Sequence, residues 1–353
     1  MNEKFWKNKK ILITGHTGFK GSWLTIWLKK LGVDITGFSK STPTKPSLFE
    51  IADVRNGIKS IEGDIKNYDF LKEVISKHEP EIIFHMAAQS LVIKSYSDPI
   101  ETFSTNVMGT VNLLNAIKEI KKPRVVVNVT SDKCYENNES LEGYTEDDPM
   151  GGYDPYSSSK GCAELITKSF RNSFFSHNEK NEVAVSSVRA GNVLGGGDWA
   201  ENRLIPDIIR AIKNKEIVNI RNPNSLRPWQ HVLDPLNGYI QLAEKLVDNK
   251  LEYSEGWNFG PDKNEIKSVS WIIEKFNELW KNKINWKIEN NELHEAENLV
   301  LNCQKAKSKL KWNTKIPIEK SLIWTIEWYQ KYFEGENMRK VTEEQIEKFE
   351  NLE

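Results

Sequence analysis

Tyr156 and Lys160 lie four residues apart in the segment DPYSSSK, which runs from residue 154 to 160. In an α-helix this spacing places both side chains on one face. A neighbouring ammonium favours the ionised form of a phenol, so we expect Tyr156 to act as a base near neutral pH. Such a base takes the proton of an alcohol while a hydride leaves the carbon. A Tyr and a Lys at this spacing also occur by chance on helix surfaces, so the interpretation depends on what precedes them.

A glycine-rich loop precedes them near the N-terminus, with the sequence GHTGFKG at residues 15–21. An apolar strand is expected at 11–14 and a helix at 23–31, which is the context of a dinucleotide-binding loop. Glycines let the backbone approach a pyrophosphate, and a helix N-terminus offers N–H donors and a positive dipole end. The alternative is a tight turn that needs glycine for geometry alone, and the flanking elements argue against it. The loop residues expected to contact the cofactor are Gly15, Thr17, Gly18, Phe19 and Gly21.

The adenosine end of this predicted site departs from the usual pattern. An Asp or Glu normally follows the loop by about 20 residues, at the end of the second strand, and binds the ribose. Here Ser39 and Lys40 stand at that place and could accept a 2′-phosphate, so we expect NAD while NADP remains open. The other expected cofactor contacts are Ser39, Asp64, Ile65, Ala87, Ala88, Gln89 and Asn106.

The first half of the chain alternates strands and helices. Expected strands lie at 11–14, 33–38, 82–84, 125–129 and 183–188, and expected helices at 23–31, 107–120 and 156–170. This alternation predicts an α/β fold, a doubly wound parallel sheet of the Rossmann type. Residues 1–190 are expected to form mainly the dinucleotide-binding domain.

After residue 190, glycines and prolines break the chain into short elements. We expect residues 191–335 to form a smaller substrate-binding domain interleaved with the first, with helices at 269–280 and 318–333. Residues 336–353 are strongly charged and are expected to form a tail, in which Thr342 and Gln345 could cap a short solvent-facing helix.

Composition excludes several classes of protein. The 353 residues carry 49 basic and 50 acidic side chains, a net charge of −1, so no global charge attracts nucleic acid or an anionic membrane. The first apolar run is too short for a signal or a membrane span, and we expect a cytoplasmic protein. Neither the three cysteines nor the six histidines show metal-binding spacing, so no protein-bound metal is predicted.

With these motifs together, the chain resembles the extended short-chain dehydrogenases/reductases, whose Tyr-x-x-x-Lys pair matches Tyr156 and Lys160. In that family a Ser or Thr after the preceding strand completes the site, and Ser131 holds this position. The next residues, Asp132 and Lys133, resemble the acid-bearing pair of the nucleotide-sugar 4,6-dehydratases, which is usually Asp-Glu. The Lys in place of Glu resembles the branch that acts on CDP-glucose.

Longer segments support this resemblance, namely GHTGFKGSWL, DPMGGYDPYSSSKGCAEL, RAGNVLGGGDWA, RNPNSLRPWQHVLD and WNFGP. The resemblance implies a C4 oxidation by Tyr156, Lys160 and Ser131, loss of water across C5 and C6 with Asp132 as the acid, and return of the hydride to C6. Lys133 would remove the C5 proton, orient Asp132 or stabilise the enolate. Expected substrate contacts are Asn192, Arg203, Arg227 and His231.

Several alternatives remain open at this point. Each arginine could be a surface ion-pair residue, and His231 beside Trp229 could be a packed residue rather than a ligand. The activity could be that of a 4-epimerase or of a dehydratase for another nucleotide sugar, and a non-catalytic dinucleotide sensor is a further possibility. The expected partner is a CDP-sugar. The resemblance implies a homodimer or a dimer of dimers through helices 107–120 and 156–170, and a role in making deoxysugars for a surface polysaccharide.

Overall fold

The computed structural model describes residues 2–120, 123–175, 183–280, 284–289 and 298–352. Its centre is a seven-stranded sheet with the order β11-β6-β5-β4-β1-β2-β3, in which every pair of neighbours is parallel. The strands are β1 Lys10–Thr14, β2 Asp34–Ser39, β3 Lys59–Glu62, β4 Ile82–His85, β5 Val125–Val129, β6 Ala184–Ala190 and β11 Gly256–Phe259. The predicted doubly wound α/β fold is confirmed.

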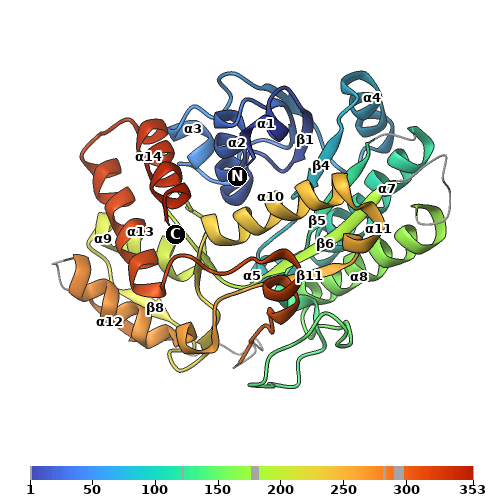
Figure 1. Cartoon of the computed structure of the whole chain (residues 1–353). Coiled ribbons are helices and arrows are strands. Elements are labelled where there is room, and N and C mark those ends of the chain that lie inside the picture. The colour runs from blue at the N-terminus through green and yellow to red at the C-terminus, as the bar shows by residue number, and fades with distance from the viewer. Residues whose placement is uncertain (1, 121–122, 176–182, 281–283, 290–297, 353) are drawn as a thin grey trace.

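Helices cover both faces of this sheet (Figure 1). One face carries α2 Phe19–Lys30, α10 Leu233–Asp248 and α11 Lys250–Tyr253, and the other carries α4 Tyr68–His78, α7 Gly109–Ile120 and α8 Pro155–Phe170. Alternate residues of a strand point to opposite faces. Ile11 and Ile13 accordingly pack in the core with α2, whereas Leu12 packs in the core with α4 and α7. Both faces of β1 are therefore buried, which explains its unbroken apolar run.

The strand order reverses between β1 and β4, which are neighbours in the sheet. In doubly wound sheets, ligands bind outside the carboxyl ends of the strands at such a reversal. The register pairs Thr14 with His85 and Thr14 with Phe38, so β1, β2 and β4 end at one level. The loops that follow these strands are thereby brought to one edge of the sheet.

Short strand pairs and four α-helices lie in the described residues of 191–232 and 260–352, which we call the smaller part of the molecule. The pairs are β7 Val193–Leu194 with β10 Gln230–His231, β8 Val218–Ile220 with β13 Trp286–Ile288, and β9 Leu226–Arg227 with β12 Lys267–Ser268. The helices are α9 Leu204–Asn214, α12 Val269–Trp280, α13 Ile318–Phe333 and α14 Met338–Glu350. The chain leaves the large sheet after β6 and returns to it at β11, so residues 191–335 do not form one continuous unit.

The C-terminal segment differs from its prediction as a charged tail. It forms α14, which packs against α2 and α13 and buries Val341, Ile346 and Phe349. Asn337 caps this helix, whereas the predicted capping residues Thr342 and Gln345 are buried and bond to α13. The prediction of a solvent-facing helix is wrong because the charged residues occupy only the outer face of an amphipathic helix.

Candidate active site

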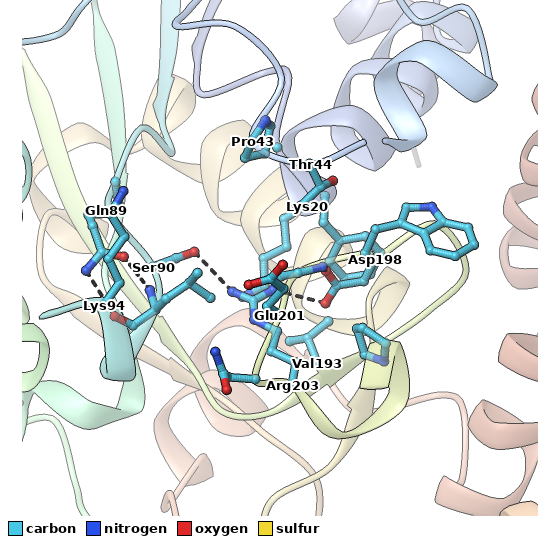
Figure 2. A pocket seen from close by; sticks show the side chains of 18 of the residues that line it. Lys20, Pro43, Thr44, Gln89, Ser90, Lys94, Val193, Asp198, Glu201 and Arg203 are labelled. Atoms are coloured by element: carbon cyan, nitrogen blue, oxygen red, sulfur yellow. Dashed lines mark hydrogen bonds and ion pairs between the residues drawn. The ribbon is translucent and has the colours of Figure 1, made fainter. Parts of the chain in front are cut away.

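A cavity of about 1170 Å³ opens at the carboxyl ends of the strands. The segments that follow β1, β2, β4, β5 and β6 all contribute to its wall, together with residues 198–207 and 219–229 of the smaller part. Figure 2 shows a portion of this wall, with side chains from the glycine loop, from the loop after β4 and from the loop before α9. Most of the residues that the sequence singles out for chemistry line this cavity.

The glycine loop joins β1 to α2 and forms one wall of this cavity. Gly15 has φ +77°, and a Cβ there would lie 2.7 Å from the Ala87 backbone nitrogen. A Cβ on Gly21 would lie 2.2 Å from the Gly15 carbonyl oxygen. Only glycine fits both positions, and Gly18 begins α2 without a side-chain cap. The loop thus keeps the backbone bare at a helix N-terminus, which suits the pyrophosphate of a dinucleotide.

Most of the other predicted cofactor contacts also line the cavity: Thr17, Phe19, Ser39, Asp64, Ile65, Ala87, Ala88 and Gln89. The Thr17 and Ser39 hydroxyls share a hydrogen bond of 2.8 Å that ties the glycine loop to the end of β2. The chain therefore offers one continuous surface from the pyrophosphate loop to the expected place of the adenosine.

Asn106 has a different place from the one predicted. Its side chain is buried, accepts a hydrogen bond from the Gln89 N–H at 2.8 Å and donates to the Gln89 carbonyl at 2.9 Å and to Ser159 at 2.8 Å. It does not line the cavity. We therefore correct the cofactor-contact prediction: Asn106 holds the loop after β4 against α8.

The Tyr156–Lys160 pair lies at the start of α8, as predicted. Asp154 caps this helix by accepting the Ser157 N–H at 2.9 Å, and Pro155 is its first residue. The Lys160 ammonium lies 6.0 Å from the centre of the Tyr156 ring and donates to the Val129 carbonyl at 3.4 Å. Both side chains are buried and both line the cavity. The start of α8 thus places Tyr156 and Lys160 at the end of β5.

The electrostatics of this pair differ from the expectation drawn from its spacing. Burial raises the pKa of the Tyr156 phenol to about 12, while a hydrogen bond with Ser131 acts in the opposite direction. Burial also lowers the pKa of Lys160 to about 8, against the effect of the Glu164 carboxylate. In the protein alone, Tyr156 is therefore protonated near neutral pH. Burial penalises both charged forms, and the ammonium by itself does not overcome this penalty.

Ser131 and Asp132 follow β5 and line the same cavity as Tyr156 and Lys160. The Ser131 hydroxyl donates to Asp132 Oδ1 at 3.0 Å and accepts the Lys133 N–H at 3.2 Å. Asp132 Oδ2 is buried and has no hydrogen-bond partner among the described residues. Burial raises the pKa of Asp132, although Lys133 and the Ser131 hydrogen bond lower it. A carboxyl group with a raised pKa at the wall of a cavity is suited to donate a proton.

Lys133 lies in a 3₁₀ turn over Asp132–Cys134 and also lines the cavity. A Cβ added to Gly191, after β6, would lie 3.1 Å from Asp132 Oδ2 and 2.4 Å from the Pro228 side chain. The close approach of these backbone segments encloses Asp132 from the side of the smaller part.

A buried ion pair supports the end of β5 from behind. Glu164, one turn after Lys160 on α8, binds the Arg189 guanidinium of β6 at 2.8 Å and accepts hydrogen bonds from Ser187 at 2.6 Å and from Thr130. Burial alone would raise the pKa of Glu164, but Arg189 and these donors lower it overall. The pair joins the helix of Tyr156 to both strands beside the site, and sequence analysis missed it because its members become neighbours only in the fold.

Two predicted substrate arginines lie in the cavity wall, as does Asn192. Arg203 donates to Asp198 at 3.0 Å and to Ser90 at 3.1 Å, and Figure 2 shows this link across the cavity between the loop before α9 and the loop after β4. Arg227 is buried and donates to the Leu226 carbonyl at 3.0 Å. Both guanidinium groups are thus held by the protein at the wall.

His231 is not in the cavity, and its prediction as a substrate contact is wrong. Its side chain is fully buried, with the ring centre 6.0 Å from that of Trp23 and 5.5 Å from that of Trp324. Burial lowers its pKa to about 3, so the ring is neutral. The packing alternative, which the neighbouring Trp229 already suggested, describes it correctly.

Lys20 is a cavity residue that the sequence analysis passed over, although it lies within the glycine loop itself. Burial lowers its pKa to about 8, the positive charge of Arg203 lowers it further, and Asp132 acts in the opposite direction. Figure 2 shows its side chain extending into the cavity in the region of Asp198 and Arg203. The signal that could have identified Lys20 is its position between Gly18 and Gly21 of the predicted dinucleotide-binding loop.

Two kinds of feature are absent from the described residues. Within them, no helix has the length and apolar character needed to cross a membrane. In the same part of the chain, no three His, Cys, Asp or Glu side chains gather as a metal site would require.

Residues 12–323 match the family model described as GDP-mannose 4,6 dehydratase. The chain belongs to this family. Among curated relatives, it is 50% identical over 341 residues to a CDP-glucose 4,6-dehydratase of Salmonella typhimurium, covering 96% of this chain and 95% of that one. It is 25% identical to a dTDP-glucose 4,6-dehydratase of Haemophilus influenzae, covering 90% of this chain and 97% of that one.

Solved structures share the fold of this dehydratase-family chain. A UDP-glucose 4-epimerase of Thermotoga maritima, solved with UDP-glucose, superposes with a TM-score of 0.80 at 22% identity, covering 92% of this chain and 99% of that one. A dTDP-glucose 4,6-dehydratase of Bacillus anthracis, solved with NAD, gives 0.76 at 23% identity, covering 92% and 97%. At this identity the likeness establishes the fold alone.

The buried pair behind the site generates a prediction about stability. Glu164→Gln leaves Arg189 charged and uncompensated in the interior, and the free energy of unfolding should fall by about 3–5 kcal/mol in denaturant titrations. Glu142→Gln is the matched control, because Glu142 pairs with Lys263 on the exposed surface and should leave the unfolding midpoint almost unchanged. Equal midpoints for Glu164→Gln and the control would show that the buried pair does not stabilise the fold.

Proposed function

We propose that the protein is a CDP-glucose 4,6-dehydratase, which converts CDP-glucose to CDP-4-keto-6-deoxyglucose with a recycled NAD. The observation that carries the proposal is the buried Asp132 carboxyl, with one oxygen without a described partner, in the same cavity wall as Tyr156 and Lys160. Hydride transfer alone needs only the Tyr–Lys pair, whereas expulsion of water needs an acid as well. The relative that is 50% identical bears the name of this activity.

The residues present fit a dinucleotide. Gly15 and Gly21 keep open the space that a Cβ would fill, and the Thr17–Ser39 link continues the surface toward the end of β2. When bound, NAD⁺ would supply the acceptor and later the donor of the hydride, and its positive charge would lower the pKa of the Tyr156 phenol.

Tyr156 takes the proton of the sugar 4-hydroxyl as the hydride leaves C4, and Ser131 and Lys160 stabilise the phenolate that this requires. The resulting ketone acidifies the proton on C5. Asp132 gives its proton to the 6-hydroxyl, which departs as water when the C5 proton is removed. Lys133 removes that proton, orients Asp132 or stabilises the enolate. Return of the hydride to C6 and of a proton to C5 completes the product.

Particular cations hold the diphosphate of the substrate, because the net charge of −1 gives no general attraction. Arg227 and Arg203 present guanidinium forks at the cavity wall, and Asn192 adds an amide. The choice of cytosine rests on the likeness to the named relative.

The acid role generates a direct prediction. Asp132→Asn keeps the shape of the side chain and removes its proton, so formation of product lighter by one water should fall by roughly 100-fold or more. The measurement is mass spectrometry of the reaction of purified protein with CDP-glucose. Asp69→Asn, at an exposed position outside the cavity, should retain the wild-type rate.

The same assay tests the proposed function in the wild type. A product of unchanged mass with inverted C4 would instead indicate a 4-epimerase. Faster loss of water from dTDP- or GDP-sugars would reassign the substrate, and tight binding of cofactor without turnover of any sugar nucleotide would indicate a sensor.

We also propose a homodimer, or a dimer of such dimers, formed through α7 and α8. Large apolar side chains are exposed on α8 and on elements that pack against it, namely Ile100, Phe103, Met108, Leu165 and Phe174. Exposed apolar groups of this size on neighbouring elements are typical of a contact with another protein surface. A cytoplasmic location stays a prediction of the sequence.

Sedimentation velocity tests this interface. Leu165→Lys places a charge at the centre of the proposed contact, and the variant should sediment as a monomer while the wild type sediments as a dimer or tetramer. Ile288→Lys is the control, since Ile288 is as exposed as Leu165 but lies on β13. A monomeric wild type, or an unchanged Leu165→Lys variant, would contradict the assignment.

A further inference from the structure

The end of β2 lacks the acid that binds the adenosine ribose in most dinucleotide folds. Ser39 ends this strand, and its hydroxyl is bound to Thr17 of the glycine loop at 2.8 Å. Lys40 follows, and its backbone carbonyl lies 3.4 Å from the same Thr17 hydroxyl. Lys40 therefore stands where an NADP-dependent enzyme would accommodate the 2′-phosphate.

Lys40 is not a lone cation. Its ammonium lies 2.9 Å from Asp64 Oδ2 and 3.0 Å from Glu101 Oε1. Lys66 joins the same two acids, at 3.6 Å from Asp64 and in a shorter contact with Glu101. Lys40, Asp64 and Glu101 line the cavity. We call these four side chains the adenosine-end cluster.

The members of the cluster come from three separate parts of the chain. Lys40 follows β2, Asp64 and Lys66 follow β3, and Glu101 lies on the short helix α6, Pro99–Phe103. Glu101 is 61 residues from Lys40 in the sequence. Its presence beside the end of β2 is therefore a consequence of the fold alone.

The charges of the cluster balance, with two ammonium groups against two carboxylates. Hydrogen bonds from Lys66 and then Lys40 lower the pKa of Glu101 to about 2, so it is ionised at neutral pH. The hydrogen bond to Asp64 is the main cause that raises the pKa of Lys40, so it is charged as well. A 2′-phosphate placed here would meet no net positive charge and would compete with Glu101 for Lys40.

We propose that Glu101 supplies, from α6, the negative charge that the end of β2 lacks, and thereby makes the cavity select NAD over NADP. This inference rests on the proposed dinucleotide-dependent function. Lys40 taken alone suggests NADP. Its positive charge is offset by Glu101 and Asp64, so the adenosine end suits a ribose without a phosphate. Removing one carboxylate leaves an excess positive charge that favours a phosphate.

The competing explanation is that these four side chains form a surface ion-pair cluster with no effect on cofactor binding. Such clusters have little effect on a site when their members are solvated and distant from it. Here the side chains of Asp64 and Glu101 are 30% and 27% exposed and stand in the cavity wall beside the Thr17–Ser39 link. The cluster is therefore placed to act on a ligand.

The test compares the Kd values of NAD⁺ and NADP⁺ for the full-length protein by isothermal titration calorimetry. Glu101→Gln retains a hydrogen-bonding side chain and loses the charge, so NADP⁺ binding should tighten about tenfold while NAD⁺ binding changes by less than about twofold. Lys40→Met leaves an excess negative charge and should shift the ratio in the opposite direction. Glu142→Gln, an exposed partner of Lys263 outside the cavity, is the matched control and should shift neither Kd.

The outcomes separate this inference from the proposed function. Opposite shifts of the NADP⁺ to NAD⁺ ratio in the two variants support it. A ratio unchanged in both, with NAD⁺ still bound, overturns the role of Glu101 and leaves the dehydratase proposal intact. Failure of the wild type to bind either dinucleotide overturns both.

Discussion

The Asp132 carboxyl is held at the end of β5 with one oxygen bound to Ser131 and the other without a described partner. Taking such a group out of water disfavours its ionised form, which raises its pKa. The same burial raises the pKa of Tyr156 and lowers those of Lys160 and Lys20. One physical cause thus adjusts the acid, the base and the two neighbouring ammonium groups of the site.

This arrangement requires a scaffold that resists relaxation. The Glu164–Arg189 pair joins α8 to β6, and Thr130 joins the same carboxylate to the end of β5. Asn106 performs a similar task for the loop after β4. Glu164, Arg189 and Asn106 do not line the cavity, yet they fix the elements whose ends carry Tyr156 and Asp132. Buried polar groups that are held by several hydrogen bonds are suited to fixing one arrangement.

The local signals of the sequence predicted the fold and the elements that carry the expected site residues. The β1–glycine loop–α2 unit and the capped start of α8 are each encoded within a few residues, so their patterns are legible without the rest of the chain. Failures arose where tertiary contacts decide. Packing between Trp23 and Trp324 made His231 a core residue, and contact with α2 turned the charged C-terminal segment into a buried helix. Glu101 could not be found from the sequence, because only the fold brings α6 to the end of β2.

Infrared difference spectroscopy tests most directly whether burial raises the pKa of Asp132. The spectrum of the wild type minus that of Asp132→Asn isolates the carboxyl band, which can be followed as the pH is changed. We expect the protonated C=O band to persist above the ordinary aspartate pKa of about 3.9 and to disappear at a clearly higher pH. A carboxylate band that is already complete at or below that value would contradict the account.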